Sequence, residues 1–124
     1  MPVRRRPYVL KVREVNSATN TRRQTLLTPA KGYRIRLVRV RVLQPEREGR
    51  RLWELYFGSA PNIVTDLKKG IDILAVPNGG SDSTRTYPRN EGPRGLRDEP
   101  LSGRWRGVAP ATPHRIIIEY SEEP

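Results

Sequence analysis

Residues 33–42, which read Tyr-Arg-Ile-Arg-Leu-Val-Arg-Val-Arg-Val, alternate between apolar and cationic side chains almost without a break. An alternation of period 2 indicates a β-strand with one buried face. The apolar set changes phase along the segment, from Tyr33, Ile35 and Leu37 to Val38, Val40 and Val42. A shift of one residue would turn the second half outward unless the strand contains an extra residue. We therefore expect a β-bulge or a bend near residues 37–38.

The rest of the chain predicts further short strands. Its 124 residues are the size of one domain, and its 12 prolines and 10 glycines favour strands and turns over helices. We expect strands at residues 8–15, 24–28, 33–42, 52–58, 71–76, 84–87, 104–108 and 114–120. A helical turn is expected only within residues 59–69. This spacing predicts an all-β fold, a single β-sandwich or jelly-roll-like barrel of about seven or eight strands.

Two of these strands define the expected core. The inward-facing sets are Trp53, Leu55 and Phe57 in residues 52–58, and Ile116, Ile118 and Tyr120 in residues 114–120. Glu54 and Tyr56 fall on the opposite face of the first of these strands. We interpret the aromatic side chains as core, because no second strand with rings lies nearby to form a base-stacking platform.

Both ends of the chain are expected to lie outside the sandwich. The first residues, Pro-Val-Arg-Arg-Arg-Pro after Met1, are bracketed by prolines, which cannot start a β ladder. Ser-Glu-Glu-Pro follows the last predicted strand. We therefore divide the chain into a basic N-terminal arm at residues 1–7, a β-sandwich domain at residues 8–120 and an acidic C-terminal tail at residues 121–124.

The net charge of +11 is concentrated at the start of the chain. Residues 1–41 carry twelve basic side chains and a single acidic one, whereas residues 42–124 carry twelve of each. This asymmetry indicates docking on a polyanion or on an acidic protein surface. For residues 33–42 taken alone, the pattern favours a merely solvated face, and it is the charge distribution of the whole chain that indicates docking. The candidate partner-binding residues are Arg4, Arg5, Arg6, Arg22, Arg23, Arg34, Arg36, Arg39 and Arg41.

The chain offers few residues for catalysis or metal binding. It has no cysteine, which excludes thiolate metal sites, and its single histidine, His114, opens a strand directly after a proline. The adjacent carboxylates at residues 98–99 and 122–123 should diverge, and no Gly-x-Ser-x-Gly motif is present. We therefore expect neither enzymatic activity nor a cofactor. No apolar run is long enough to predict a membrane span.

Three pieces of the sequence follow one another in a recognisable order. They are Gln-Thr-Leu-Leu-Thr-Pro-Ala-Lys-Gly-Tyr-Arg-Ile-Arg-Leu at residues 24–37, Leu-Trp-Glu-Leu-Tyr-Phe-Gly at 52–58, and a closing piece with Asp-Glu-Pro-Leu-Ser-Gly-Arg-Trp-Arg-Gly at 98–107 and His-Arg-Ile-Ile-Ile-Glu-Tyr at 114–120. This order resembles small β-sandwich structural proteins of tailed bacteriophages, in which a Leu-Thr-Pro-Ala-x-Gly turn leads into a strand. The resemblance covers residues 24–122, and the basic arm departs from the shortest versions of the pattern.

Proteins of this kind occur as head decoration (cement) proteins and as minor tail components. The resemblance implies a non-enzymatic virion protein, a capsid decoration protein on the phage head that binds the lattice of the major capsid protein. It also implies a homo-oligomer, with a trimer favoured. A minor tail or neck component is the alternative within this class. The alternative of another class is a nucleic-acid-binding β-barrel that uses the same arginines on phosphates, since charge alone serves either partner.

Overall fold

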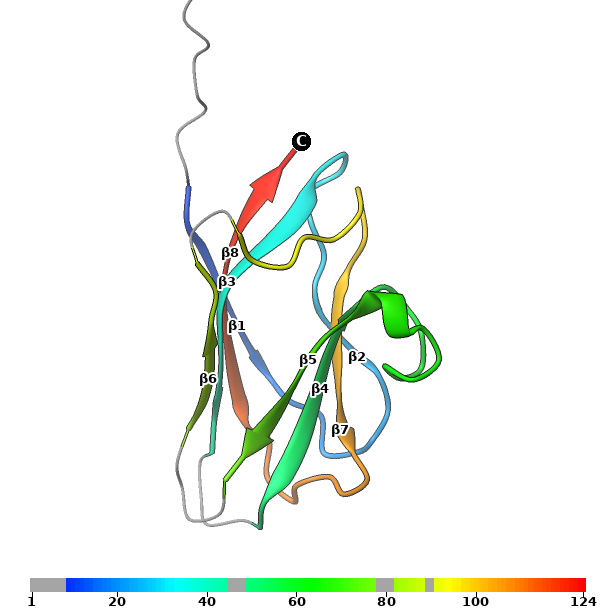
Figure 1. The fold of residues 1–124 in the computed structure, drawn as a ribbon. Helices are drawn as coiled ribbons and strands as arrows, with labels where there is room; N and C mark the ends of the chain where they lie inside the picture. The colour runs from blue at the N-terminus through cyan, green and yellow to red at the C-terminus, as the bar shows by residue number, and fades with distance from the viewer. Residues whose placement is uncertain (1–8, 45–48, 78–81, 89–90) are drawn as a thin grey trace, which may run out of the picture.

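The protein is a sandwich of two antiparallel β-sheets (Figure 1). A computed structural model describes residues 9–44, 49–77, 82–88 and 91–124, so the predicted arm lies outside the described residues. The elements are β1 (Lys11–Asn16), β2 (Gln24–Leu27), β3 (Arg34–Leu43), β4 (Arg51–Phe57), η1 (Leu67–Lys69, a 3-10 helix), β5 (Gly70–Val76), β6 (Ser83–Thr86), β7 (Leu101–Arg106) and β8 (Arg115–Glu123). Within the described ranges, no helix is long and apolar enough to cross a membrane.

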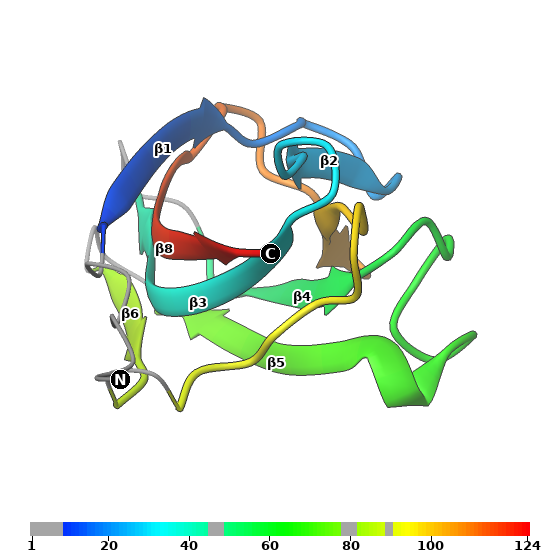
Figure 2. The ribbon, with the colours of Figure 1, turned by 90° about the horizontal axis from the view of Figure 1, so that it is seen from above.

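The strands pair in a nested order. β4 pairs with β5, β3 with β6, β2 with β7 and β1 with β8, so each pair encloses the previous one in the sequence. The sheets have the orders β1-β8-β3-β6 and β2-β7-β4-β5, and Figure 2 shows them from above. This nesting is the arrangement of a jelly roll. The predicted all-β sandwich is confirmed.

The alternating segment forms β3, and a bulge accommodates its change of phase. The pairing of β3 with β8 shifts register between Leu37 and Arg39, so Val38 is the extra residue. The core-facing side chains on the two sides of the shift, each fully buried, are Ile35, Leu37, Val40 and Val42. The bulge expected near residues 37–38 is therefore confirmed, and it keeps both halves of the strand facing the core.

Two residues of the predicted inward set of this strand do not face the core. Val38 is only half-buried, because as the bulge residue it has no direct partner on β8. Tyr33 precedes the strand and is 36% exposed. The period-2 pattern assigned both residues to the apolar face, but the geometry of the bulge and of the preceding turn moves them off it.

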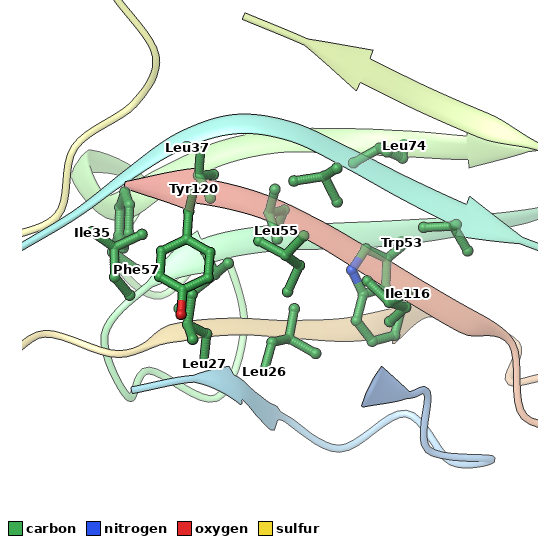
Figure 3. Packing of buried hydrophobic residues seen from close by; sticks show 14 of the residues in the cluster. Leu26, Leu27, Ile35, Leu37, Trp53, Leu55, Phe57, Leu74, Ile116 and Tyr120 are labelled. Carbon is green, nitrogen blue, oxygen red and sulfur yellow. The ribbon is translucent and has the colours of Figure 1, made fainter. Parts of the chain in front are cut away.

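The core lies between the two sheets (Figure 3). Trp53 on β4 and Trp105 on β7 are direct register partners, and their rings meet edge to face with centroids 4.8 Å apart. A side chain at Gly103 would collide with them, because a Cβ there would lie 2.4 Å from the Trp53 ring. Both predicted inward sets, on β4 and β8, are buried as expected.

The other face of β4 is buried as well. Glu54 and Tyr56, which point away from the core, both have 0% exposure. Arg104 on β7 donates a hydrogen bond to the carbonyl of Thr21 at 3.1 Å, which places the connection between β1 and β2 against this face. The sheet is thus covered on its outer side too, which the alternation in residues 52–58 did not predict.

The end of the chain differs from the expectation. The predicted acidic tail at residues 121–124 is wrong for its first three residues, because β8 continues to Glu123 and pairs there with the first half of β3. Glu123 pairs with Arg36 of β3 and Glu122 with Lys11 of β1, so the charge of this stretch favours pairing instead of an extended tail. The helical turn expected within residues 59–69 is present as η1.

Residues 91–98 cover the edge of β3 where β6 has ended. Leu37 donates its N–H to the carbonyl of Pro93, and Gly95 donates to that of Ile35, each at 2.9 Å. Gly92 permits this approach, since a Cβ there would come within 1.8 Å of the Leu37 carbonyl oxygen. This irregular segment therefore continues the protection that β6 gives to the other half of β3.

Replacing Ile118 by alanine should destabilise the protein by about 2–5 kcal/mol, because the deleted methyl groups leave a cavity between the sheets. Ile117 lies on the opposite face of β8 and is only half-buried, so Ile117→Ala should cost about 1 kcal/mol. Urea denaturation followed by tryptophan fluorescence measures both losses. Equal losses would contradict this assignment and indicate that another chain covers the outer face of β8.

Candidate partner-binding surface

Four of the nine candidate arginines lie together on β3. The apolar residues of β3 point inward on both sides of the bulge, and the arginines that alternate with them therefore point outward from the first sheet. These outward-facing residues are Arg34, Arg36, Arg39 and Arg41, and each is half-buried. The structure thus gathers one part of the predicted set on a single sheet face.

Two of these arginines are paired with carboxylates of β8. The Nε atom of Arg36 lies 2.5 Å from Oε1 of Glu123, and Nε of Arg39 contacts Oε2 of Glu119. Arg39 and Glu119 are direct register partners across the two strands. Opposite charges placed in this way stabilise neighbouring strands. β8 therefore neutralises the charge of two of the arginines that sequence analysis proposed as partner-binding residues.

The other two β3 arginines differ from each other. Arg41 pairs with Asp82, with 3.5 Å between Nη2 and Oδ2. Arg34 has its Nε atom buried without a hydrogen-bond partner. Three of the four guanidinium groups are thus engaged within the chain, so β3 does not present a continuous row of free cations.

Glu123 joins three segments of the chain. It accepts hydrogen bonds from Arg36 and, at 3.3 Å, from Nη1 of Arg94. The hydrogen bond from Arg36 is the main reason why the pKa of Glu123 is lowered below its usual value, against the opposing effect of partial burial. Arg36 also donates to the carbonyl of Gly92 at 3.0 Å. The cluster therefore ties β8 and β3 to the segment at residues 91–98.

Two carboxylates hold the Pro-Ala-Lys-Gly turn at residues 29–32. Glu122 accepts hydrogen bonds from the N–H of Ala30 at 2.9 Å and from Nζ of Lys11 at 3.0 Å. Asp98 accepts one from the N–H of Gly32 at 2.5 Å. Gly32 has a φ of 84°, a conformation that favours glycine. Two of the sequence pieces that carry the resemblance thus meet in space at this turn.

The remaining candidate arginines are not on this sheet face. Arg22 and Arg23 lie in the connection between β1 and β2, and neither forms an ion pair within the described part of the chain. Arg22 is exposed, whereas Arg23 donates hydrogen bonds to Oγ1 of Thr25 at 2.9 Å and to Oγ of Ser102 at 3.4 Å. The candidates that lie outside the described residues are Arg4, Arg5 and Arg6.

One buried ion pair was not predicted. Nε of Arg104 lies 2.6 Å from Oε2 of Glu54, whose side chain is 1% exposed. The second carboxylate oxygen, Oε1, has no hydrogen-bond partner. Glu54 is the only acidic residue in the otherwise apolar residues 52–58. This isolated position is the sequence feature that could have indicated a buried ion pair. A carboxylate that is buried on such a strand requires a paired cation or other hydrogen-bond donors.

A further arginine that sequence analysis did not select is Arg13 on β1. It is exposed and forms no ion pair with any described residue. Its register partner is Ile118, so it points to the same side of the sheet as the core. There it stands near Tyr120, whose pKa is raised by burial and by the Glu122 carboxylate, and lowered to a smaller extent by the charges of Lys11 and Arg13.

His114 has a structural position. Its ring is fully buried and meets the Trp105 ring edge to face, with centroids 5.0 Å apart. Nδ1 lies 3.0 Å from the carbonyl oxygen of Thr112, which can only accept, so Nδ1 carries the proton. The backbone N–H donates to Oγ of Ser17 at 2.9 Å. Among the described residues, no group of three or more His, Cys, Asp or Glu side chains could hold a metal ion.

The carboxylates at residues 98–99 also serve the fold. Glu99 accepts a hydrogen bond from the N–H of Leu96 at 3.0 Å and pairs with Nζ of Lys69 at 2.7 Å. Asp98 holds the turn described above. The two side chains therefore act on different segments, as expected for adjacent residues.

No protein-family model, no curated protein and no solved structure matches this chain.

Glu123→Gln should destabilise the protein by about 1 kcal/mol at neutral pH, because the charge-assisted hydrogen bonds to Arg36 and Arg94 are weakened. The folded-state pKa of Glu123 is lowered. The ionised carboxylate of Glu123 therefore stabilises the folded state fully at a pH above the unfolded-state pKa of about 4.3. This stabilisation is lost as the pH falls through the folded-state pKa. Urea unfolding should show a difference from the wild type at neutral pH that shrinks at acidic pH, as the carboxyl group becomes protonated. Glu14→Gln, at an exposed residue of β1, is the control and should change little at either pH; a difference that persists undiminished in acid would contradict the assignment.

Arg104→Leu should cost about 3–5 kcal/mol, because it leaves the buried carboxylate of Glu54 without a counter-charge. The double variant Arg104→Leu/Glu54→Leu should recover most of this loss, since two apolar side chains replace the pair. Chemical denaturation of the two variants and the wild type measures both effects. A double variant as unstable as the single one would show that the loss comes from packing and not from the unpaired charge.

Proposed function

We propose that this chain is a non-enzymatic structural protein of a tailed-phage virion, a capsid decoration protein that binds the assembled head. The resemblance of three sequence pieces to such proteins supports this role. The jelly-roll order of the strands is compatible with it, because jelly rolls recur in viral capsid domains. Since a fold alone does not assign a function, the choice of partner has to come from the surface.

The pairing of the β3 arginines within the chain bears on the nucleic-acid alternative. A face that binds phosphates needs guanidinium groups that are free to contact them. Arg36, Arg39 and Arg41 already have carboxylate partners. The sheet face that was the best candidate for phosphate contacts is therefore compensated in charge, which weakens the nucleic-acid alternative and places the proposed contact with the shell outside this face.

The proposed mechanism is an added interface on the shell. Among the described residues of the first third, the cations without an ion pair are Arg13, Arg22, Arg23, Lys31 and Arg34. Arg13 lies on the edge strand β1, and Arg22 and Arg23 lie in the connection from β1 to the edge strand β2. Together with the basic residues 1–7 they would contact the major capsid protein. Binding only to the assembled lattice stabilises it by mass action. A homo-oligomer, with a trimer favoured by the resemblance, would gain avidity from several such contacts.

The deciding experiment compares binding of the full-length protein to DNA-free shells and to duplex DNA, both near physiological salt of about 0.15 M. Shells purified from particles that lack this protein provide the first partner. We expect tight binding to shells and negligible binding to the duplex. Removal of residues 1–7 should weaken binding to empty and DNA-filled shells alike, because the proposed contact is with protein.

Micromolar or tighter duplex binding without shell binding would overturn the proposal in favour of the nucleic-acid role. In that case the log–log salt slope should flatten by about 0.9 for each phosphate contact removed. Copy number distinguishes the roles within the virion. Mass spectrometry of purified particles should find hundreds of copies for a decoration protein and only a handful for a tail or neck component.

A further inference from the structure

The two long sides of the sandwich are closed to different extents. On one side, β6 and β5 are joined by an ion pair between Arg85 and Asp72, with 2.6 Å between Nε and Oδ2. Tyr87 packs against the core beside them, and burial raises its pKa to about 12. On the other side, β1 and β2 are the edge strands of their sheets, and Figure 2 shows them on the same side of the molecule.

A groove of about 350 Å³ opens on this second side. Its lining residues are Arg13, Thr25, Leu26, Leu27, Thr28 and Tyr120. Its surface is more polar than apolar, because Leu26 and Leu27 are buried in the core and Tyr120 is only 8% exposed. Arg13 adds a guanidinium group that forms no ion pair with the described residues. The groove therefore combines a mainly polar surface over the core with one uncompensated positive charge.

The strand beside this groove has the features of an open edge. Within the described residues β1 pairs with β8 alone, so the backbone groups on its other side have no strand partner. Three apolar side chains at or just before this strand are largely exposed, Val9 at 56%, Leu10 at 46% and Val12 at 60%. Native proteins usually blunt such an edge or use it to bind an added strand.

Charge argues against a second copy of the chain as the occupant. The symmetric antiparallel pairings in which at least five of residues 9–16 overlap with the same residues of a second copy are centred on residues 11 to 14. In a pairing centred on Lys11, Arg13 or Glu14, that residue lies directly opposite the same residue of the second copy. Centring on Val12 places Lys11 opposite Arg13 twice. Like charges directly opposite each other destabilise a strand pair, so every one of these registers is disfavoured.

We propose that the open edge of β1 binds an extended segment of a partner protein in which acidic and apolar residues alternate. Lys11 and Arg13 are two residues apart and point to the groove side, opposite the core-facing Tyr120 and Ile118. Acidic residues on an added strand would lie opposite these two cations. Because Lys11 is already bonded to Glu122, Arg13 is the main contact.

The apolar residues of the added strand would lie on the other face, against Leu10 and Val12. The N–H and C=O groups of the segment would complete the backbone hydrogen bonds of β1, as in other cases of β-strand addition. The inference rests on the proposed function only in assigning this segment to the shell protein. The chemistry of the segment follows from the edge itself.

The test uses the full-length protein and a fluorescein-labelled peptide, Ser-Val-Glu-Val-Glu-Val-Ser, with Ser-Val-Lys-Val-Lys-Val-Ser as its counterpart. Fluorescence anisotropy should show binding of the acidic peptide and not of the basic one. Arg13→Glu should weaken binding about tenfold, since one attraction is replaced by a repulsion. Arg106→Glu is the matched control, an exposed arginine at the end of β7, and should change the affinity less than twofold. Amide chemical shifts on adding the acidic peptide should change at residues 9–16.

Absence of peptide binding by the wild-type protein would overturn the proposal, as would equal binding of the two peptides. Equal losses of peptide affinity in Arg13→Glu and Arg106→Glu would also overturn the proposal, because binding would then depend on net charge alone. A concentration-dependent dimer lost in Arg13→Glu would assign the edge to a second copy. Shell binding by the same variants separates the two proposals. Peptide binding without shell binding leaves the edge site and removes the decoration role. Shell binding that Arg13→Glu leaves intact keeps the decoration role and removes the assignment of the bound segment to the shell protein.

Discussion

The pairing of β3 with β8 is the interaction on which the rest of this structure depends. β8 is the last strand in the sequence, and it lies between β1 and β3 in the first sheet. Its inward side chains, Ile116 and Ile118, meet the tryptophans of the second sheet, while its outward carboxylates meet the arginines of β3. A single residue, Val38, keeps this pairing possible by absorbing the change of phase in β3. The same strand pair therefore organises the core on one face and the charge on the other.

The distribution of charge in space differs from its distribution along the chain. The first third of the sequence holds the whole excess of positive charge, but carboxylates from the last strand lie directly against it. Nested pairing is the reason, because a jelly roll brings early and late strands together. A charge surplus read along a sequence thus overstates the free charge on the folded surface. In this protein the sheet face of β3 is largely compensated, whereas Arg13 on the edge strand β1 has no ion-pair partner among the described residues.

The edge formed by β1 is the surface that the proposed docking role would use. The opposite side of the sandwich is closed by Arg85 and Asp72, and the edge of β3 is covered by β6 and by residues 91–98. β1 has exposed apolar residues and an arginine without an ion-pair partner among the described residues. Its charges disfavour self-pairing while leaving room for an acidic strand. An edge of this kind would suit the proposed addition of this protein to an existing lattice.

The sequence by itself determined the fold class, the bulge and most of the core, because these depend on local alternation and on turn residues. The phase change in residues 33–42 located the bulge, and Trp53, Phe57 and Ile118 were assigned to the core from period 2 alone. The sequence could not determine which charges compensate one another, since Arg39 and Glu119 are far apart in the chain and meet only through the β3–β8 register. For the same reason it assigned Ser121 to Glu123 to a tail and overlooked Arg13. Only the tertiary structure decided which cations are paired and which edge stays open, because both depend on the pairing of distant strands.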